Sequence, residues 1–185
     1  MTEEEFEELI TDHPLLYHMA EDGSWPTIRE HGLMSTSAIL DFYELQGDYR
    51  SQIESARRPE TIHLQGGIGI SIAVRDQKPM LDSGLVRCLE DGLSPSEWYG
   101  ILNQRTFFWL TEERLNRLLC AGSYSGSLHD VLVVDTRSLV QTHHDAITLS
   151  PMNSGNTRPF PHPRGLRTFL PIAQYPYADR KRRKL

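Results

Sequence analysis

The apolar segments of this chain are short, and polar turns or helix-forming segments separate them. The clearest strand-like runs are IGISIAV (68–74), TFFWL (106–110) and VLVVD (131–135). Each is rich in β-branched or aromatic residues, as strands are. Because short strands alternate with short helices without a regular βαβ repeat, the pattern indicates an α+β domain with a split or strongly curved sheet.

Helix signals fill the spaces between these strands. Two starts are marked by caps: Ser94 precedes Pro95 at the first helical position, and Thr111 precedes an acidic first turn. Gly32 is a typical helix stop. Helices are predicted at residues 3–10, 36–43, 95–103 and 111–121, and one that runs to His31 with Ser24 or Thr27 as its cap. Residues 138–144 are predicted as a short helix or turn. Shorter strands are predicted at residues 15–19, 147–149 and 168–172, and residues 50–65 as either a loop or a further helix.

Length and composition suit one domain. The chain has 185 residues, of which 38% are hydrophobic, enough for a proper core. We assign residues 1–179 to a single domain and 180–185 to a basic tail. No apolar run approaches the roughly 18 residues that span a bilayer, so no membrane contact is expected. Two cysteines without a Cys-x-x-Cys motif predict a reducing compartment, the bacterial cytoplasm.

The net charge of −6 conceals an uneven distribution. Residues 1–12 carry only acids, whereas 180–184 are all basic. Such a tail is expected to be solvated rather than to bind nucleic acid. Within the folded part, residues 146–178 carry Arg158, Arg164 and Arg167 and no acid.

A histidine near the N-terminus is the first candidate for chemistry. Tyr17-His18 ends a short strand, a helix follows, and Gly32-Leu33 then leads to Ser35 and Thr36. A strand histidine can offer one ring nitrogen to a ligand hydroxyl while the backbone holds the other. A lone strand histidine is more often structural, so the surrounding segment carries the argument.

That segment resembles the start of DarT-type ADP-ribosyltransferases and, more distantly, of RNA 2′-phosphotransferases. The likeness continues in ISIAVRDQKPML (70–81), where Arg75 stands in the arginine position. The whole chain is more similar to an uncharacterised bacterial domain family. The segments that carry this second likeness are 97–99, 102–109, 134–136, 153–155 and 164–169.

The resemblance implies an ADP-ribosyltransferase-like split, curved sheet with short helices, and NAD as the substrate. It implies catalytic roles for His18, Arg75 and Arg164, and transfer of ADP-ribose to nucleic acid or protein. A toxin of this kind would have an antidote protein as a partner. The cofactor-binding candidates are Tyr17, His18, Ser35, Thr36, Arg105, Asn153 and Ser154.

The chemistry of NAD suggests how these residues divide the work. His18 would hold a ribose, Tyr17 would pack or stack, and Arg75, Arg105 or Arg164 would hold the pyrophosphate by paired hydrogen bonds. The segment Asn153-Ser154-Gly155-Asn156 is either an anion-binding nest or a surface loop that uses Asn and Gly for turns. Both interpretations stay open on the sequence alone.

One departure separates binding from catalysis. Most ADP-ribosyltransferases place a glutamate on a late strand, but this chain has no glutamate after Glu113. The alternative function is therefore a phosphate- or nucleotide-binding module without turnover. No metal is expected, because His143-His144-Asp145 would place neighbouring side chains on opposite faces if extended and lacks a helical His-x-x-x-His spacing.

Overall fold

A computed structural model describes residues 1–65 and 70–183. Its α-helices are α1 (Glu3–Asp12), α2 (Trp25–His31), α3 (Thr36–Phe42), α4 (Gly47–Glu54), α5 (Asp82–Leu85), α6 (Pro95–Asn103), α7 (Glu112–Leu119), α8 (Thr136–His143) and α9 (Tyr177–Arg182). Its strands are β1 (Leu15–Glu21), β2 (Ile62–Gln65), β3 (Ser71–Val74), β4 (His129–Asp135), β5 (Thr148–Leu149) and β6 (Leu170–Pro171). The chain is a single α+β domain with short helices and small antiparallel sheets.

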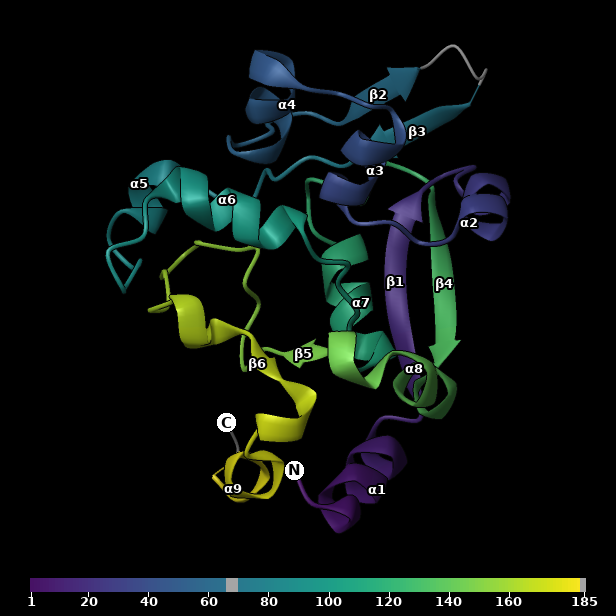
Figure 1. Cartoon of the computed structure of the whole chain (residues 1–185), viewed down its shortest axis with the longest axis vertical. Coiled ribbons are helices and arrows are strands. Elements are labelled where there is room, and N and C mark those ends of the chain that lie inside the picture. Colours follow the sequence, from purple (N-terminus) through teal and green to yellow (C-terminus); the bar gives the residue numbers. More distant parts are fainter. Residues whose placement is uncertain (66–69, 184–185) are drawn as a thin grey trace.

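The longest sheet joins segments far apart in the sequence. Strands β1 and β4 run antiparallel side by side, with Leu15 opposite Asp135 and Glu21 opposite His129 (Figure 1). On the other edge of β1, Tyr17 exchanges two backbone hydrogen bonds with Trp109, at 3.0 and 2.7 Å. The other two sheets are the hairpin β2–β3 and the short pair β5–β6. The described strands therefore form three small sheets instead of one continuous surface.

Several apolar clusters take the place of one central core. The largest buries Trp98 and Leu85 completely, at 0% exposure, beneath the segment that carries Phe169. A second packs α3 and α4 against the β2–β3 hairpin, and a third packs α7 against β1 through Leu115 and Met19. Small clusters of this kind follow from the short elements, since none of them offers a long apolar face.

The capping signals in the sequence are confirmed. The Ser94 hydroxyl accepts from the backbone of Glu97, and the Glu97 carboxylate accepts from Ser94 in return, with Pro95 at the first position of α6. Thr111 caps α7 by accepting from the Arg114 backbone. Gly32 ends α2 with a φ of 84°, a left-handed value that suits glycine.

Other boundaries differ from the sequence expectation. Of the predicted strand at residues 106–110, only Trp109 pairs with β1, through Tyr17. Two residues further along the same edge, the Met19 carbonyl accepts instead from the Arg75 guanidinium. Residues 50–65 contain the end of α4 and the strand β2. The predicted strand 68–74 begins in part outside the described residues, and β3 covers its remainder from Ser71. Strand 168–172 shortens to β6 between two 3₁₀ turns.

The basic C-terminal segment packs on the acidic N-terminal helix (Figure 1). Lys181 of α9 forms ion pairs with Glu8 and Asp12 of α1. The Tyr177 hydroxyl donates to Asp12 at 2.6 Å. Residues 181–183 are exposed, as expected of a solvated tail, but the segment is also helical and Lys181 pairs with acids at the other end of the chain.

Candidate functional site

His18 lies on β1 with one ring nitrogen anchored. Its Nδ1 is 2.8 Å from the carbonyl oxygen of Phe107. A carbonyl only accepts, so Nδ1 carries the hydrogen and Nε2 is left as an acceptor when the ring is neutral. Burial lowers the pKa of His18; the Phe107 carbonyl opposes this shift and the charge of Arg75 adds to it. The ring is therefore neutral near pH 7, with Nε2 free to accept from a hydroxyl.

Arg75 follows β3 and reaches the same strand. Its Nη1 donates to the carbonyl of Met19, the residue after His18, at 3.1 Å. The guanidinium lies over the ring of Tyr124, 5.1 Å from its centre. Burial lowers the pKa of Arg75, while Tyr124, Asp76 and Glu21 raise it. The structure thus brings two of the predicted catalytic residues, His18 and Arg75, to one edge of β1.

A polar cavity of about 440 Å³ opens beside Arg75. Its lining contains both charge signs and several hydroxyl groups. The lining residues are Glu21, Asp22, Thr61, Arg75, Asp76, Lys78, Ser123, Tyr124, Ser127, Leu128 and His129. Arg75 therefore lines the cavity, whereas His18 does not.

Hydrogen bonds order the floor of this polar cavity. The Tyr124 hydroxyl donates to Asp76 at 2.9 Å, and the Lys78 backbone donates to the same oxygen at 3.0 Å. Burial raises the pKa of Tyr124 to about 12, so the hydroxyl keeps its proton. Oε2 of Glu21 is buried and has no hydrogen-bond partner among the described residues. The cavity is therefore lined by the guanidinium of Arg75 and by the carboxylate of Glu21, one oxygen of which accepts no hydrogen bond from the described residues.

Arg164 does not join His18 and Arg75. It is 1% exposed, and its guanidinium donates to the carbonyls of Ser154, Asn156 and His162 at 2.8, 2.9 and 3.0 Å. It also lies over the Trp98 ring. Since its guanidinium N–H groups donate to backbone carbonyls of residues 154–162, Arg164 holds this loop in place. A catalytic or pyrophosphate-holding role is not supported by this geometry.

Arg105 is also engaged within the fold. Its guanidinium lies 4.5 Å from the centre of the Phe169 ring and donates to the carbonyl of Ile101. Burial lowers the pKa of Arg105. The aromatic contact and the backbone bond together place Arg105 in the packing around Phe169, apart from the contacts that hold Arg75.

The remaining predicted binding residues are dispersed. Ser35 caps α3 by accepting from the Ala38 backbone at 3.2 Å, and Thr36 is the first residue of that helix. Asn153 accepts from the Gly155 backbone at 3.1 Å, which closes a local turn. Ser154 is 4% exposed. Of the two interpretations of this segment, the turn is the one that the contacts favour.

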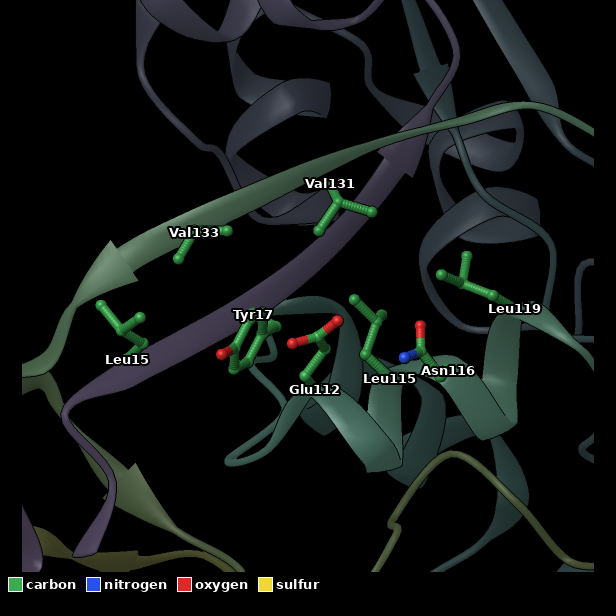
Figure 2. A pocket seen from close by; sticks show the side chains of 8 residues that line it. All are labelled: Leu15, Tyr17, Glu112, Leu115, Asn116, Leu119, Val131 and Val133. Atoms are coloured by element: carbon green, nitrogen blue, oxygen red, sulfur yellow. The ribbon is translucent and has the colours of Figure 1, made fainter.

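Tyr17 points away from the His18 side of β1, because neighbouring strand residues alternate between faces. It lines a second hollow, of about 480 Å³, between the β1–β4 sheet and α7. Figure 2 shows it there beside the carboxylate of Glu112 and the apolar side chains of the sheet. Tyr17 and His18 therefore cannot stack on and hold the same part of a ligand.

Sequence reasoning missed Asp76, Tyr124 and Glu21 in the lining of the cavity. Asp76 adjoins Arg75 in the turn after β3, and that proximity is a signal that could have found it. Tyr124 lies in a stretch rich in Ser and Gly, and no pattern in the sequence connects it to Arg75. Only the fold places its ring beneath the guanidinium.

The comparisons with known proteins give a family without an activity. A model described as "Family of unknown function (DUF7002)" matches residues 14–185. No curated protein and no solved structure matches the chain.

Across residues 1–65 and 70–183, no helix has the length and apolar composition needed to cross a membrane. The same residues contain no group of three or more His, Cys, Asp or Glu side chains placed to bind a metal ion.

Proposed function

We propose that this chain, which belongs to the family of unknown function DUF7002, binds NAD beside His18 and Arg75 and transfers its ADP-ribose to an acceptor. The observation that carries the proposal is the anchoring of His18 on Phe107, next to a guanidinium fixed on Met19. The likeness of residues 17–36 and 70–81 to DarT-type enzymes supports the same choice of substrate and an ADP-ribosyltransferase-like split sheet.

The side chains suit a sugar joined to phosphate. A neutral imidazole accepts from a hydroxyl but gives no attraction to an anion, so the free Nε2 of His18 fits a ribose hydroxyl. Arg75 supplies positive charge and unused N–H groups, which fit pyrophosphate oxygens. A hydroxyl acceptor next to a cation is the combination that a ribose phosphate requires.

Transfer also needs a carboxylate or another group that favours positive charge developing on the ribose. The sequence lacks a late glutamate, but Glu21 and Asp76 line the cavity that Arg75 opens onto. Asp76 is already bonded to Tyr124 and Lys78, whereas Glu21 keeps one oxygen unpaired among the described residues. Glu21 is the carboxylate we assign to this role. Since Glu21 and His18 lie on opposite faces of β1, the ribose beside Glu21 and the ribose that His18 holds are the two different riboses of NAD.

A second function, nucleotide binding without turnover, is favoured by a specific observation. Arg164 and Arg105 spend donors on the backbone of the chain, which leaves Arg75 as the one predicted arginine that lines the cavity. A site with a single arginine can hold a nucleotide without driving its cleavage. In the catalytic case the acceptor is nucleic acid or protein, and an antidote protein would control the enzyme.

Calorimetry with NAD, together with chromatography of released nicotinamide, tests both functions. The expected result is NAD binding by the wild type that weakens about three- to tenfold in His18→Ala, the loss of one hydrogen bond. The exposed histidine of α8 provides the control variant His143→Ala, which should bind as the wild type does. Binding with nicotinamide release supports transfer, and binding without release supports the second function. Absence of NAD binding refutes both.

A further inference from the structure

The outer edge of β4 carries unpaired backbone groups. Because Tyr17 directs its N–H and C=O toward Trp109, alternate residues of β1 direct theirs toward β4, and His18 pairs with Leu132. The backbone groups of Val131 and Val133 must then point outward. Within residues 1–65 and 70–183, no strand pairs with this edge of β4.

The face of the sheet next to this edge is apolar and open. Leu15 and Val131 are each 41% exposed and Val133 is 55% exposed. Helix α7 covers the β1 side of this face through Leu115, which is 2% exposed. In Figure 2 Val131 and Val133 stand on β4 above the hollow of about 480 Å³, and α7 lies across from them beneath β1. The cover of the sheet therefore stops short of β4.

The usual protection of an edge strand is absent from β4. Natural edge strands carry Lys, Pro or free charges that discourage pairing with another chain. The sequence His129-Asp130-Val131-Leu132-Val133-Val134-Asp135 has no Lys or Pro. Its two carboxylates are engaged within the chain: Asp130 accepts from the Trp25 backbone at 2.8 Å and Asp135 from the Ser138 backbone at 2.7 Å. The seven-residue edge is therefore suited to receive another strand.

We propose that β4 of a second copy of this chain pairs antiparallel with this edge and forms a symmetric dimer. Centring the pair on Leu132 places Val131 of one copy opposite Val133 of the other, and vice versa. Both residues direct their backbone groups outward, so this register brings donors and acceptors together. A continuous four-stranded sheet, in the order β1-β4-β4-β1, results.

Self-complementarity favours a second copy over an unrelated peptide. In the same register His129 of one copy lies opposite Asp135 of the other, and no two carboxylates oppose each other. Both nitrogens of the His129 ring face its own chain, since Nδ1 is buried and Nε2 lies 3.2 Å from the Tyr124 carbonyl. A strand that pairs in this register therefore needs β-branched residues opposite Val131 and Val133 and no carboxylate opposite Asp135. Strand β4 itself meets these requirements at the required spacing.

Sedimentation equilibrium over a wide concentration range tests the dimer. The wild type should associate, and Val133→Lys should weaken association by at least about tenfold, because each lysine would place a charge opposite Val131 of the other copy, with the second lysine as its diagonal neighbour. Val133 is more than half exposed, so the fold should tolerate lysine. Val86→Lys, a substitution at a 69% exposed position after α5, is the matched control and should associate as the wild type does.

Hydrogen exchange gives an independent measurement. The amides of Val131 and Val133 should become slower to exchange as the protein concentration rises, whereas that of Leu132, already paired with β1, should not change. A protein that is monomeric at every concentration, or a Val133→Lys variant that associates as the wild type does, overturns the proposal. Capture of an extended peptide from another protein by a monomeric chain also overturns it. None of these outcomes depends on NAD binding.

Discussion

His18 and Phe107 are joined by a hydrogen bond of 2.8 Å between the histidine Nδ1 and the phenylalanine carbonyl oxygen. The bond fixes the position of the ring hydrogen and therefore the face that the histidine presents to a ligand. Burial of the imidazole ring makes its charged form unfavourable, and this lowers the pKa of His18.

Stability should depend on pH through this histidine. The pKa of His18 is lowered in the folded state from its ordinary 6.5, so the unfolded chain binds the proton first as pH falls. The stabilisation is complete above about pH 6.5 and is lost progressively as pH falls from there to the folded pKa. His13 contributes with the same sign, because burial lowers its pKa too.

Thermal denaturation between about pH 5 and 8, around the ordinary histidine pKa, measures this effect. His18→Gln should flatten the fall in Tm toward acid, because glutamine has no proton to gain. His143→Gln, at an exposed position on α8, should keep the wild-type slope. An unchanged slope in His18→Gln would show that the ring is not held neutral by burial.

Substitution of Arg75 should weaken NAD binding, whereas substitution of Arg164 should lower the stability of the fold. Arg75→Met should weaken NAD binding by about 10- to 100-fold, the loss of charged hydrogen bonds. Arg164→Met leaves three carbonyls without donors, one in a buried and two in part-buried hydrogen bonds, and should lower the free energy of unfolding by about 3 kcal/mol. Its NAD affinity, measured by calorimetry below its Tm, should stay near the wild-type value. A large loss of affinity in Arg164→Met with unchanged stability would return Arg164 to the site.

The contact between the two ends of the chain should stabilise it modestly. Lys181 and the Tyr177 hydroxyl both donate hydrogen bonds to the Asp12 carboxylate. Both contacts lower the pKa of this carboxyl, and that of Lys181 has the larger effect. The stabilisation is present above the unfolded pKa of about 4 and is lost as pH falls through the lower folded value. Asp12→Asn should cost about 1 kcal/mol, since the ion pair is largely exposed to solvent.

Chemical denaturation at low and high salt tests the contact of Asp12. The difference between Asp12→Asn and the wild type should shrink at high salt, because salt screens exposed charges. Glu4→Gln, an exposed substitution on the same helix, is the control and should have a smaller effect. Equal stability of Asp12→Asn and the wild type at low salt would contradict the prediction.

Local signals in the sequence predicted most helices and strands. They could not predict which distant segments make contact. The capping box at Ser94 and the apolar run ending at Asp135 depend on neighbouring residues, so the pattern contains what is needed. The placement of Arg164 depends on carbonyls of a loop that wraps around it, which no spacing encodes. The likeness that selected His18 and Arg75 led to two residues that meet at β1. It could not show that Tyr17 faces the other side of the sheet from His18.

Arg58 holds the turn that presents Arg75, although no pattern in the sequence indicates it. Its side chain is 5% exposed, and its Nε donates to the Arg75 carbonyl at 3.0 Å. Further donors reach the Ile53 carbonyl and, at 2.9 Å, the amide oxygen of Asn103. Burial lowers the pKa of Arg58 to about 10, so the guanidinium stays charged at neutral pH. One buried cation thus connects α4, α6 and the end of β3.

Substitution of Arg58 should therefore affect stability and the site together. Arg58→Met leaves three acceptors without this donor, two of them in buried hydrogen bonds, and should lower the free energy of unfolding by about 2–4 kcal/mol. Arg58→Lys keeps the charge but reaches fewer acceptors, so it should recover part of the stability. In Arg58→Lys, NAD should bind more weakly than in the wild type, because the Arg75 carbonyl is no longer fixed. Arg87→Met, at an exposed position after α5, should change neither quantity. If Arg58→Lys loses stability but binds NAD with wild-type affinity, the guanidinium supports the fold without positioning Arg75.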